Sequence, residues 1–292
     1  MKIILAIIFI LSILPAFALE FEVSYLEGIL ELKENNKWIE LEEGDVIKDT
    51  QVVKLSDNGF VELISDEMDL TFSKDGVYPM SKIVADKKEV FSWGMGDILL
   101  AKLNQIVSEE DLRSESVMGV RANKKEKEEL EWIDESEQLL EEGIICLKEG
   151  EYNNAIEKFI EGAYSAIDVL EEEEYLFYQA VVYEKMNKKG KALKILLEIK
   201  PDNKAEFYQD YVLIKGHLLI ENLAFTDALI LFDEYLDISE NKEMKQLVKI
   251  LSFYCYKGLN NVNAAIKSLD SAYKIDPKSD YGIKALKLKE TI

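Results

Sequence analysis

The sequence predicts an α+β multidomain protein in which a small antiparallel β domain precedes an α-helical solenoid of about four repeats. Two observations carry this prediction. Residues 20–85 alternate apolar and polar side chains, which is typical of strands with one solvated face. Residues 136–278 repeat a pattern of small and apolar residues every 36 or 37 positions, which is typical of stacked helical hairpins.

The first 18 residues have the layout of a secretory signal. Lys2 precedes an apolar run over residues 3–14, and the small-x-small triplet Ala16-Phe17-Ala18 follows, so we expect cleavage after Ala18. The alternative is a retained membrane anchor. Leu19, where a lipid-anchored precursor would need cysteine, follows the triplet. No later stretch approaches the ~20 apolar residues of a membrane span. The mature chain is therefore predicted to be soluble and periplasmic or otherwise extracytoplasmic.

The β domain is expected over residues 19–90. Alternation is clearest at residues 30–32, 39–41 and 68–72. Turn-forming residues separate these strands, at 35–36, 42–45 and 56–59. We expect six to eight short strands and no helix up to residue 85.

Residues 91–135 are expected to connect the two halves. Residues 94–107 have the pattern of an amphipathic helix, and residues 108–121 are polar and irregular. Trp132 is expected to pack on the first hairpin; an exposed contact site is the alternative.

Four alanines mark the repeats, at regular spacings of 37, 36 and 37: Ala155, Ala192, Ala228 and Ala265. Twelve positions upstream of them stand Gly143, Ala180, Gly216 and Phe253. Two helices of a hairpin approach closely where side chains are small, so we expect each small residue to face the alanine of its partner helix. Phe253 breaks the rule and predicts a splayed fourth hairpin. Residues 279–292 are expected to form a capping helix.

This pattern resembles the tetratricopeptide repeat, whose unit has small residues at three fixed positions and often ends in proline. The resemblance covers residues 136–278 and is carried by Gly143, Gly150, Tyr152, Ala155, Phe159, Gly162, Ala265, Leu269, Ala272 and Pro277. The spacing exceeds that of the family by two or three residues. We place the extra length in loops at 171–174 and 200–204.

The β region resembles the FecR-like domain, an extracytoplasmic β module. The residues that carry the resemblance are Gly28, Trp38, Leu41, Gly44, Asp45, Thr50, Gly59, Val61 and Leu63. Residues 118–122 are similar to a GVRG element found downstream in such proteins, with Ala122 in place of the second glycine. The resemblance implies a fold and a compartment and leaves the chemistry open. The regulatory role of the founding members needs a transmembrane segment and a cytoplasmic region, so it is not transferred.

Charge and composition exclude several classes of function. With 57 acidic and 35 basic residues the net charge is −22, which repels nucleic acid and anionic lipid. His217 is the only histidine, and Cys146 and Cys255, the only cysteines, are expected to be buried thiols. No metal-ligand cluster, cofactor motif or nucleophile–base pair is predicted. We therefore expect no enzyme, no catalytic residue, no metal and no cofactor.

The repeat register predicts which side chains line the concave face of the solenoid. We call these eight residues the inner row: Leu140, Ile144, Phe177, Val181, Leu213, His217, Ile250 and Tyr254. Seven of the eight are apolar or aromatic, so an exposed inner row would bind a partner, such as an extended or helical peptide in a groove. The alternative is a tight superhelix in which these residues contact each other or the β domain.

Together these features predict an extracytoplasmic protein–protein interaction scaffold, with a cell-envelope component as a second candidate partner. The alternative is an envelope sensory or glycan-binding module in which the β domain recognises a ligand or a cell-wall polymer. Exposed aromatic residues would favour the alternative. The candidates are Tyr78, Trp93 and Trp38, of which Trp38 is expected in the core.

Overall fold

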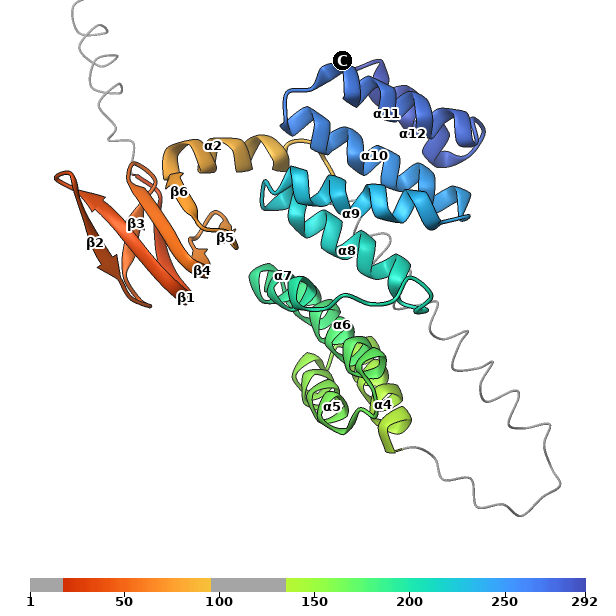
Figure 1. Cartoon of the computed structure of the whole chain (residues 1–292), viewed down its shortest axis with the longest axis horizontal. Helices are drawn as coiled ribbons and strands as arrows, with labels where there is room; N and C mark the ends of the chain where they lie inside the picture. Colours follow the sequence, from red (N-terminus) through yellow and green to blue (C-terminus); the bar gives the residue numbers. More distant parts are fainter. Residues whose placement is uncertain (1–17, 96–134) are drawn as a thin grey trace, which may run out of the picture. The chain divides into compact units, whose positions relative to one another are not determined.

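The computed structural model describes residues 18–95 and 135–292, without the side chains of residues 135–137. The chain divides into two compact units, residues 1–86 and 87–292, with the boundary inside helix α2 (Met80–Phe91). The signal segment, most of the predicted helix at 94–107, the element at 118–122 and Trp132 lie outside the described residues. The α+β fold class is confirmed, with an antiparallel sheet in the first unit and a helical region in the second (Figure 1).

The first unit contains one antiparallel sheet built around two long strands. Its strands are β1 (Glu20–Glu34), β2 (Lys37–Leu41), β3 (Val46–Lys48), β4 (Val52–Ile64), β5 (Asp69–Phe72) and β6 (Gly76–Pro79). β1 pairs with β4, and the outer edge of each long strand carries two short strands. β2 and β3 pair with opposite ends of β1, and β5 and β6 with opposite ends of β4. Every free edge is therefore a short strand, which limits edge-to-edge association.

The predicted turn at residues 35–36 is present, but the one at 56–59 is wrong. Asn35 and Asn36 have φ values of 47° and 63° and form the two-residue turn between β1 and β2. Residues 56–59 instead lie within β4, as a bulge opposite Gly28 where the β1–β4 register shifts. The backbones of β1 and β4 approach closely at this point: a Cβ on Gly28 would lie only 2.7 Å from the Cα of Gly59.

The sheet core is closed by a helix that the sequence did not predict. Met80 and Val84, on the first turns of α2, are buried with sheet residues such as Phe21 and Leu63. The predicted alternating region extends to residue 85, but α2 begins at Met80, and its buried residues Met80 and Val84 have the four-residue spacing of a helix. Val90, near the end of α2, belongs to the core of the second unit.

Trp38 and Tyr78 differ in their surroundings. Trp38 is 37% exposed, so its expected place in the core is wrong. It lies on the opposite face of β2 from Leu41, which is buried. The Nζ atoms of Lys33 and Lys54 lie 5.8 and 5.7 Å from its ring centroid. Tyr78 stacks on Phe72 with ring centroids 4.1 Å apart. We therefore assign Tyr78 to the packing of the sheet.

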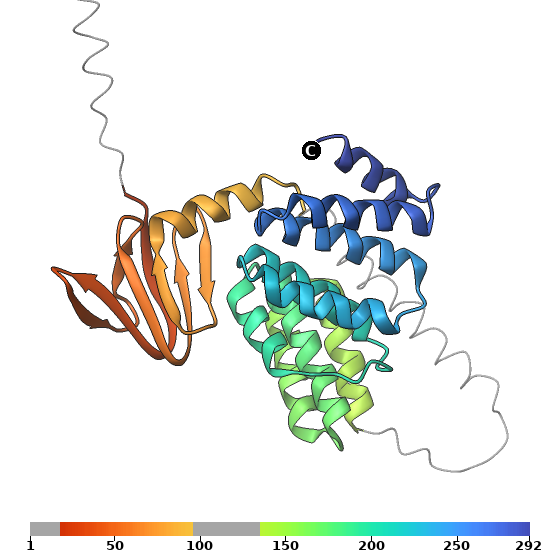
Figure 2. The ribbon, with the colours of Figure 1, turned by 45° about the horizontal axis from the view of Figure 1, so that its top comes forward.

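Residues 135–292 of the second unit form four antiparallel helix pairs and a final helix, in chain order (Figure 2). The helices are α4 (Glu135–Glu149), α5 (Tyr152–Ser165), α6 (Val169–Lys185), α7 (Lys189–Glu198), α8 (Tyr208–Glu221), α9 (Phe225–Ile238), α10 (Lys242–Gly258), α11 (Val262–Ile275) and α12 (Asp280–Lys289). Consecutive helices pack against each other, and α12 contacts both α10 and α11. All four marker alanines are buried, with at most 2% exposure.

At Gly143 and Gly216, two of the three small positions predicted for the first helices, an aromatic ring lies nearest in place of the expected marker alanine. A Cβ on Gly143 would lie 2.3 Å from the ring of Phe159, and a Cβ on Gly216 would lie 2.2 Å from that of Phe232. Both rings are fully buried and follow a marker alanine by four positions. The glycines therefore provide the space that a large ring needs at the helix crossing.

Glycine also meets an aromatic ring between consecutive pairs. A Cβ on Gly162 of α5 would lie 2.1 Å from the ring of Tyr175 in α6. A Cβ on Gly258, at the end of α10, would lie 2.4 Å from the ring of Phe225 in α9. The same type of contact thus acts within a helix pair and between neighbouring pairs.

The fourth pair is not splayed. Phe253 is buried and packs on Tyr254, with ring centroids 4.8 Å apart. Hydrogen bonds join the two helices: the Ser268 hydroxyl donates to the Lys249 carbonyl at 2.8 Å, and Gln246 Nε2 donates to the Ala272 carbonyl at 2.9 Å. The loop expected at 171–174 is also wrong, since these residues lie in the first turns of α6.

The Gly216–Phe232 contact predicts the effect of adding one methyl group. Alanine normally stabilises a helix by up to ~1 kcal/mol relative to glycine. At position 216 it overlaps the Phe232 ring, so we expect Gly216→Ala to lower the free energy of unfolding by about 1–3 kcal/mol, the usual range for overpacking. Thermal unfolding of the full chain, followed by circular dichroism, measures this change.

The control is the double variant Gly216→Ala/Phe232→Leu, in which a smaller side chain makes room for the methyl group. It should lose less stability than the sum of its single substitutions. A stabilised Gly216→Ala single variant would contradict the contact.

Candidate functional site

Six of the eight inner-row residues are buried. Phe177, Val181, Leu213, His217, Ile250 and Tyr254 are at most 3% exposed, whereas Leu140 and Ile144 are half-buried. The expected exposure is therefore wrong for these six. Packing between neighbouring helix pairs is the reason: for example, Phe177 stacks on Phe207, from the connection between α7 and α8, with ring centroids 5.1 Å apart. The alternative prediction, a tightly packed inner row, describes these six residues.

The chain itself covers Tyr254 at the C-terminal end of the inner row. Trp93 stacks on Tyr254 with ring centroids 5.8 Å apart and an interplanar angle of 17°. Its ring also lies 6.2 Å from that of Phe225, and Lys257 Nζ lies 4.6 Å from its centroid. The neighbouring Met95 is buried in the same core. Trp93 is thus an internal packing residue of the second unit.

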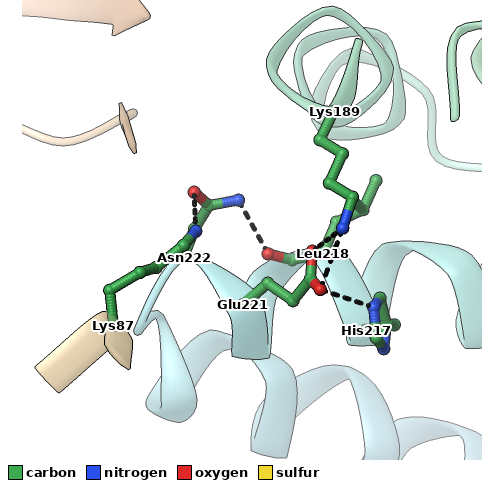
Figure 3. Close-up of polar contacts among 6 residues, drawn as sticks. All are labelled: Lys87, Lys189, His217, Leu218, Glu221 and Asn222. Atoms are coloured by element: carbon green, nitrogen blue, oxygen red, sulfur yellow. Dashed lines mark hydrogen bonds and ion pairs between the residues drawn. The ribbon is translucent and has the colours of Figure 1, made fainter. Parts of the chain in front are cut away.

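A buried polar cluster surrounds the single histidine (Figure 3). His217 Nε2 lies 3.1 Å from Glu221 Oε1, one turn further along α8. Lys189, at the start of α7, places Nζ 3.0 and 2.8 Å from the two Glu221 carboxylate oxygens. The side chain of Glu221 is 7% exposed and that of His217 2%. These three residues join α7 to α8 through charge-assisted hydrogen bonds.

The two carboxyl groups near His217 have opposite pKa shifts. Burial alone would raise the pKa of Glu221, but the hydrogen bonds and charges of His217 and Lys189 outweigh burial and lower it to about 2. Burial raises the pKa of Glu184, an effect that the charges of Lys189 and His217 only partly offset. Four side-chain atoms of the described residues are buried without a hydrogen-bond partner, and two of them, Glu184 Oε2 and His217 Nδ1, belong to this region. Glu221 is thus the carboxylate that the cluster stabilises.

Asn222 links the end of α8 to helix α2. Asn222 Nδ2 donates to the Leu218 carbonyl at 2.8 Å, and its Oδ1 lies 3.4 Å from Lys87 Nζ (Figure 3). Lys87 is only 4% exposed. Together with Trp93, this lysine fixes the end of α2 within the second unit.

The cluster is suited to stabilising the contact between α7 and α8, because its histidine is buried and hydrogen-bonded to a carboxylate. Sequence reasoning placed His217 in a binding groove and did not identify Lys189, Glu184 or Glu221 as its neighbours. The four-residue spacing of His217 and Glu221 on an apolar helix was the available signal. Lys189, on another helix, had no local signal.

The cysteines are free thiols, and burial raises the pKa of each. Cys255 is buried and Cys146 half-buried. A raised pKa disfavours the reactive thiolate. In residues 18–95 and 135–292 no group of three or more histidine, cysteine or acidic side chains is arranged to hold a metal ion. Across the same part of the chain, no helix combines the length and apolar character of a membrane span.

Comparisons with known proteins place the chain in no family. No family model matches it, and no curated protein matches it. Among solved structures, the crystal structure of the apo form of RapI is similar at 21% sequence identity and a TM-score of 0.41. The match covers 64% of this chain and 55% of that one, so it spans about half of that chain's length. A similarity at this level carries no argument about function.

The Glu221 contacts predict an acid-sensitive stability. Because the folded pKa of Glu221 lies below its ordinary value of 4.5, its carboxylate stabilises the fold at neutral pH, and this contribution is lost as the pH falls from 4.5 towards about 2. Glu221→Gln removes the charge and leaves the buried His217 and the partly exposed Lys189 beside a neutral amide. We expect the variant to lose roughly 3 kcal/mol at neutral pH and to be less sensitive to acid than the unaltered chain.

Urea unfolding at neutral pH and at about pH 3 measures both effects. Glu198→Gln, at an exposed position of α7, is the matched control and should leave the unfolding curve unchanged. Equal pH dependence in the Glu221→Gln variant and the unaltered chain would contradict the assigned role.

Proposed function

We propose that this protein is an exported, non-enzymatic scaffold that binds a protein partner through its helical unit. In this proposal, residues 136–278 form a solenoid of tetratricopeptide-like repeats and the first unit is a FecR-like module. The observation that supports it best is the buried alanine at the same position of all four helix pairs. Repeats of this kind build an extended surface, which suits protein binding.

The proposed contact begins at the N-terminal end of the inner row. Leu140 and Ile144 are half-buried there, whereas the other six inner-row residues are needed for packing. An extended or helical peptide of the partner would cover these two side chains. The net charge of −22 disfavours nucleic acid as the partner.

The start of the first unit is compatible with the proposed export. Cleavage after Ala18 would leave Leu19 and the whole of β1 in the mature protein. The Leu19 carbonyl accepts a hydrogen bond from the backbone N–H of Asp49 at 2.9 Å, and Phe21 is fully buried in the sheet core. The mature chain would thus begin at the first residues that the sheet uses.

A sensory or glycan-binding role for the first unit is the second candidate. Trp38 favours it, because this partly exposed ring with Lys33 and Lys54 beside it offers a stacking surface and cationic hydrogen-bond donors. Thermal shifts of the full chain with soluble cell-wall fragments, compared with those of Trp38→Ala, distinguish the candidates. A shift that the substitution abolishes would favour ligand recognition.

Photo-crosslinking in the producing cells tests the scaffold proposal. A photoreactive amino acid at position 140 or 144 should capture a protein. The same amino acid at position 283, where Ile283 of α12 is exposed, is the matched control. The captured protein, once purified, should bind the unaltered chain and lose at least about tenfold in affinity with Leu140→Glu. Identical crosslinks at all three positions, or unchanged affinity with a folded variant, would contradict the proposal.

A further inference from the structure

The connection between α5 and α6 exposes an unusual density of large apolar side chains. Five lie within eleven residues: Ile160 at 40% exposure, Tyr164 at 90%, Ile167 at 76%, Val169 at 69% and Leu170 at 44%. We call these five residues the α5–α6 corner. Single exposed apolar residues are common on protein surfaces, whereas a dense group of them marks a binding site.

The corner has a defined backbone. The Glu171 N–H donates to Asp168 Oδ1 at 2.9 Å, and the Ile167 N–H donates to Glu171 Oε2 at 2.7 Å. Asp168 is the N-cap residue of α6, and Glu171 accepts from the residue before it, so the two hydrogen bonds together order the start of α6. Between Ile160 and Tyr164, Gly162 lies against the buried ring of Tyr175. The apolar side chains are therefore held towards solvent by ordered structure on both sides.

Acidic residues are frequent along the chain at the corner. Residues 157–174 contain seven acidic residues and one basic residue, Lys158. The Lys158 ammonium pairs with Glu142 at 2.5 Å, so its charge is locally neutralised. Glu157, Glu161 and Glu172 are exposed. The surface thus combines apolar contact area with a negative rim.

We propose that the α5–α6 corner docks a basic amphipathic segment of a protein partner. The apolar side of such a segment would cover Tyr164 and Ile167, and its lysine or arginine side chains would meet the acidic rim. This inference rests on the proposed scaffold function and adds the chemistry of a partner and a second contact surface. The negative rim repels anionic lipid and nucleic acid, and it opposes a symmetric contact between two copies, which would bring two negative rims together.

Binding of a synthetic peptide to the full chain tests this proposal. The probe is a short, fluorescently labelled helical peptide of leucine and lysine, and its counterpart carries glutamate in place of lysine. We expect the lysine peptide to bind and the glutamate peptide not to bind. Tyr164→Ser/Ile167→Ser should weaken binding by about tenfold or more. Added salt should also weaken binding.

The matched control is Leu259→Ser/Val262→Ser, which removes two exposed apolar side chains from the connection between α10 and α11. It should leave peptide affinity unchanged. Equal affinity of both double variants, or equal binding of both peptides, would overturn the proposal. A dimer of the unaltered chain that Tyr164→Ser/Ile167→Ser makes monomeric would also overturn it, because a second copy would then be the occupant.

The two proposals fail separately. If positions 140 and 144 capture no protein but the lysine peptide still binds selectively, only the inner-row contact is rejected. Crosslinking at those positions with no selective peptide binding would reject the α5–α6 corner alone.

Discussion

An aromatic ring lying against a glycine backbone sets the distance between helices at four places in the helical unit. Gly143 receives Phe159 and Gly216 receives Phe232 within helix pairs, whereas Gly162 receives Tyr175 and Gly258 receives Phe225 between pairs. At each crossing even a methyl group would lie within 2.4 Å of a ring atom, well inside van der Waals contact. The rings supply the buried apolar area, and the glycines allow the helices to approach. The positions of these glycines therefore fix how one pair stacks on the next.

This close packing determines which surfaces remain for binding. It buries most of the inner row, and Trp93 covers Tyr254. The remaining polar cluster at Glu221 joins α7 to α8 and contributes to the stability of the same interface. Exposed apolar area is concentrated instead where one pair connects to the next, at Tyr164 and Ile167. The packing thus leaves two candidate contact surfaces, the half-buried Leu140 and Ile144 and the exposed α5–α6 corner.

The helix pairs were predictable because their signal is local. A marker alanine recurs at nearly constant spacing, and each helix contains its own apolar periodicity. The alternation in β1 and β2 was equally readable. Helix α2 was missed because its apolar residues were assigned to the preceding alternating region. The residue nearest Gly143 and Gly216 was misassigned by four positions, one helical turn, because sequence spacing does not define which turns of two helices meet.

The exposure of the inner row could not be read from the sequence. Burial of Phe177 depends on Phe207, thirty positions later, and burial of Tyr254 depends on Trp93, which precedes the first repeat. The buried polar cluster likewise forms only because the fold brings together Lys189 and Glu221, which belong to two different helix pairs. At the α5–α6 corner, Ile160 and Tyr164 have the four-residue spacing of a buried stripe, so their exposure gives no signal in the sequence.

Nuclear magnetic resonance of glycine-labelled protein tests the packing claim most directly. The Hα protons of Gly143, Gly162, Gly216 and Gly258 should show ring-current shifts and nuclear Overhauser contacts to the rings of Phe159, Tyr175, Phe232 and Phe225, respectively. Gly150 has open space where a Cβ would stand and serves as the internal reference. Ordinary chemical shifts and no aromatic contacts at the four glycines, in a chain of native helical content, would contradict the account.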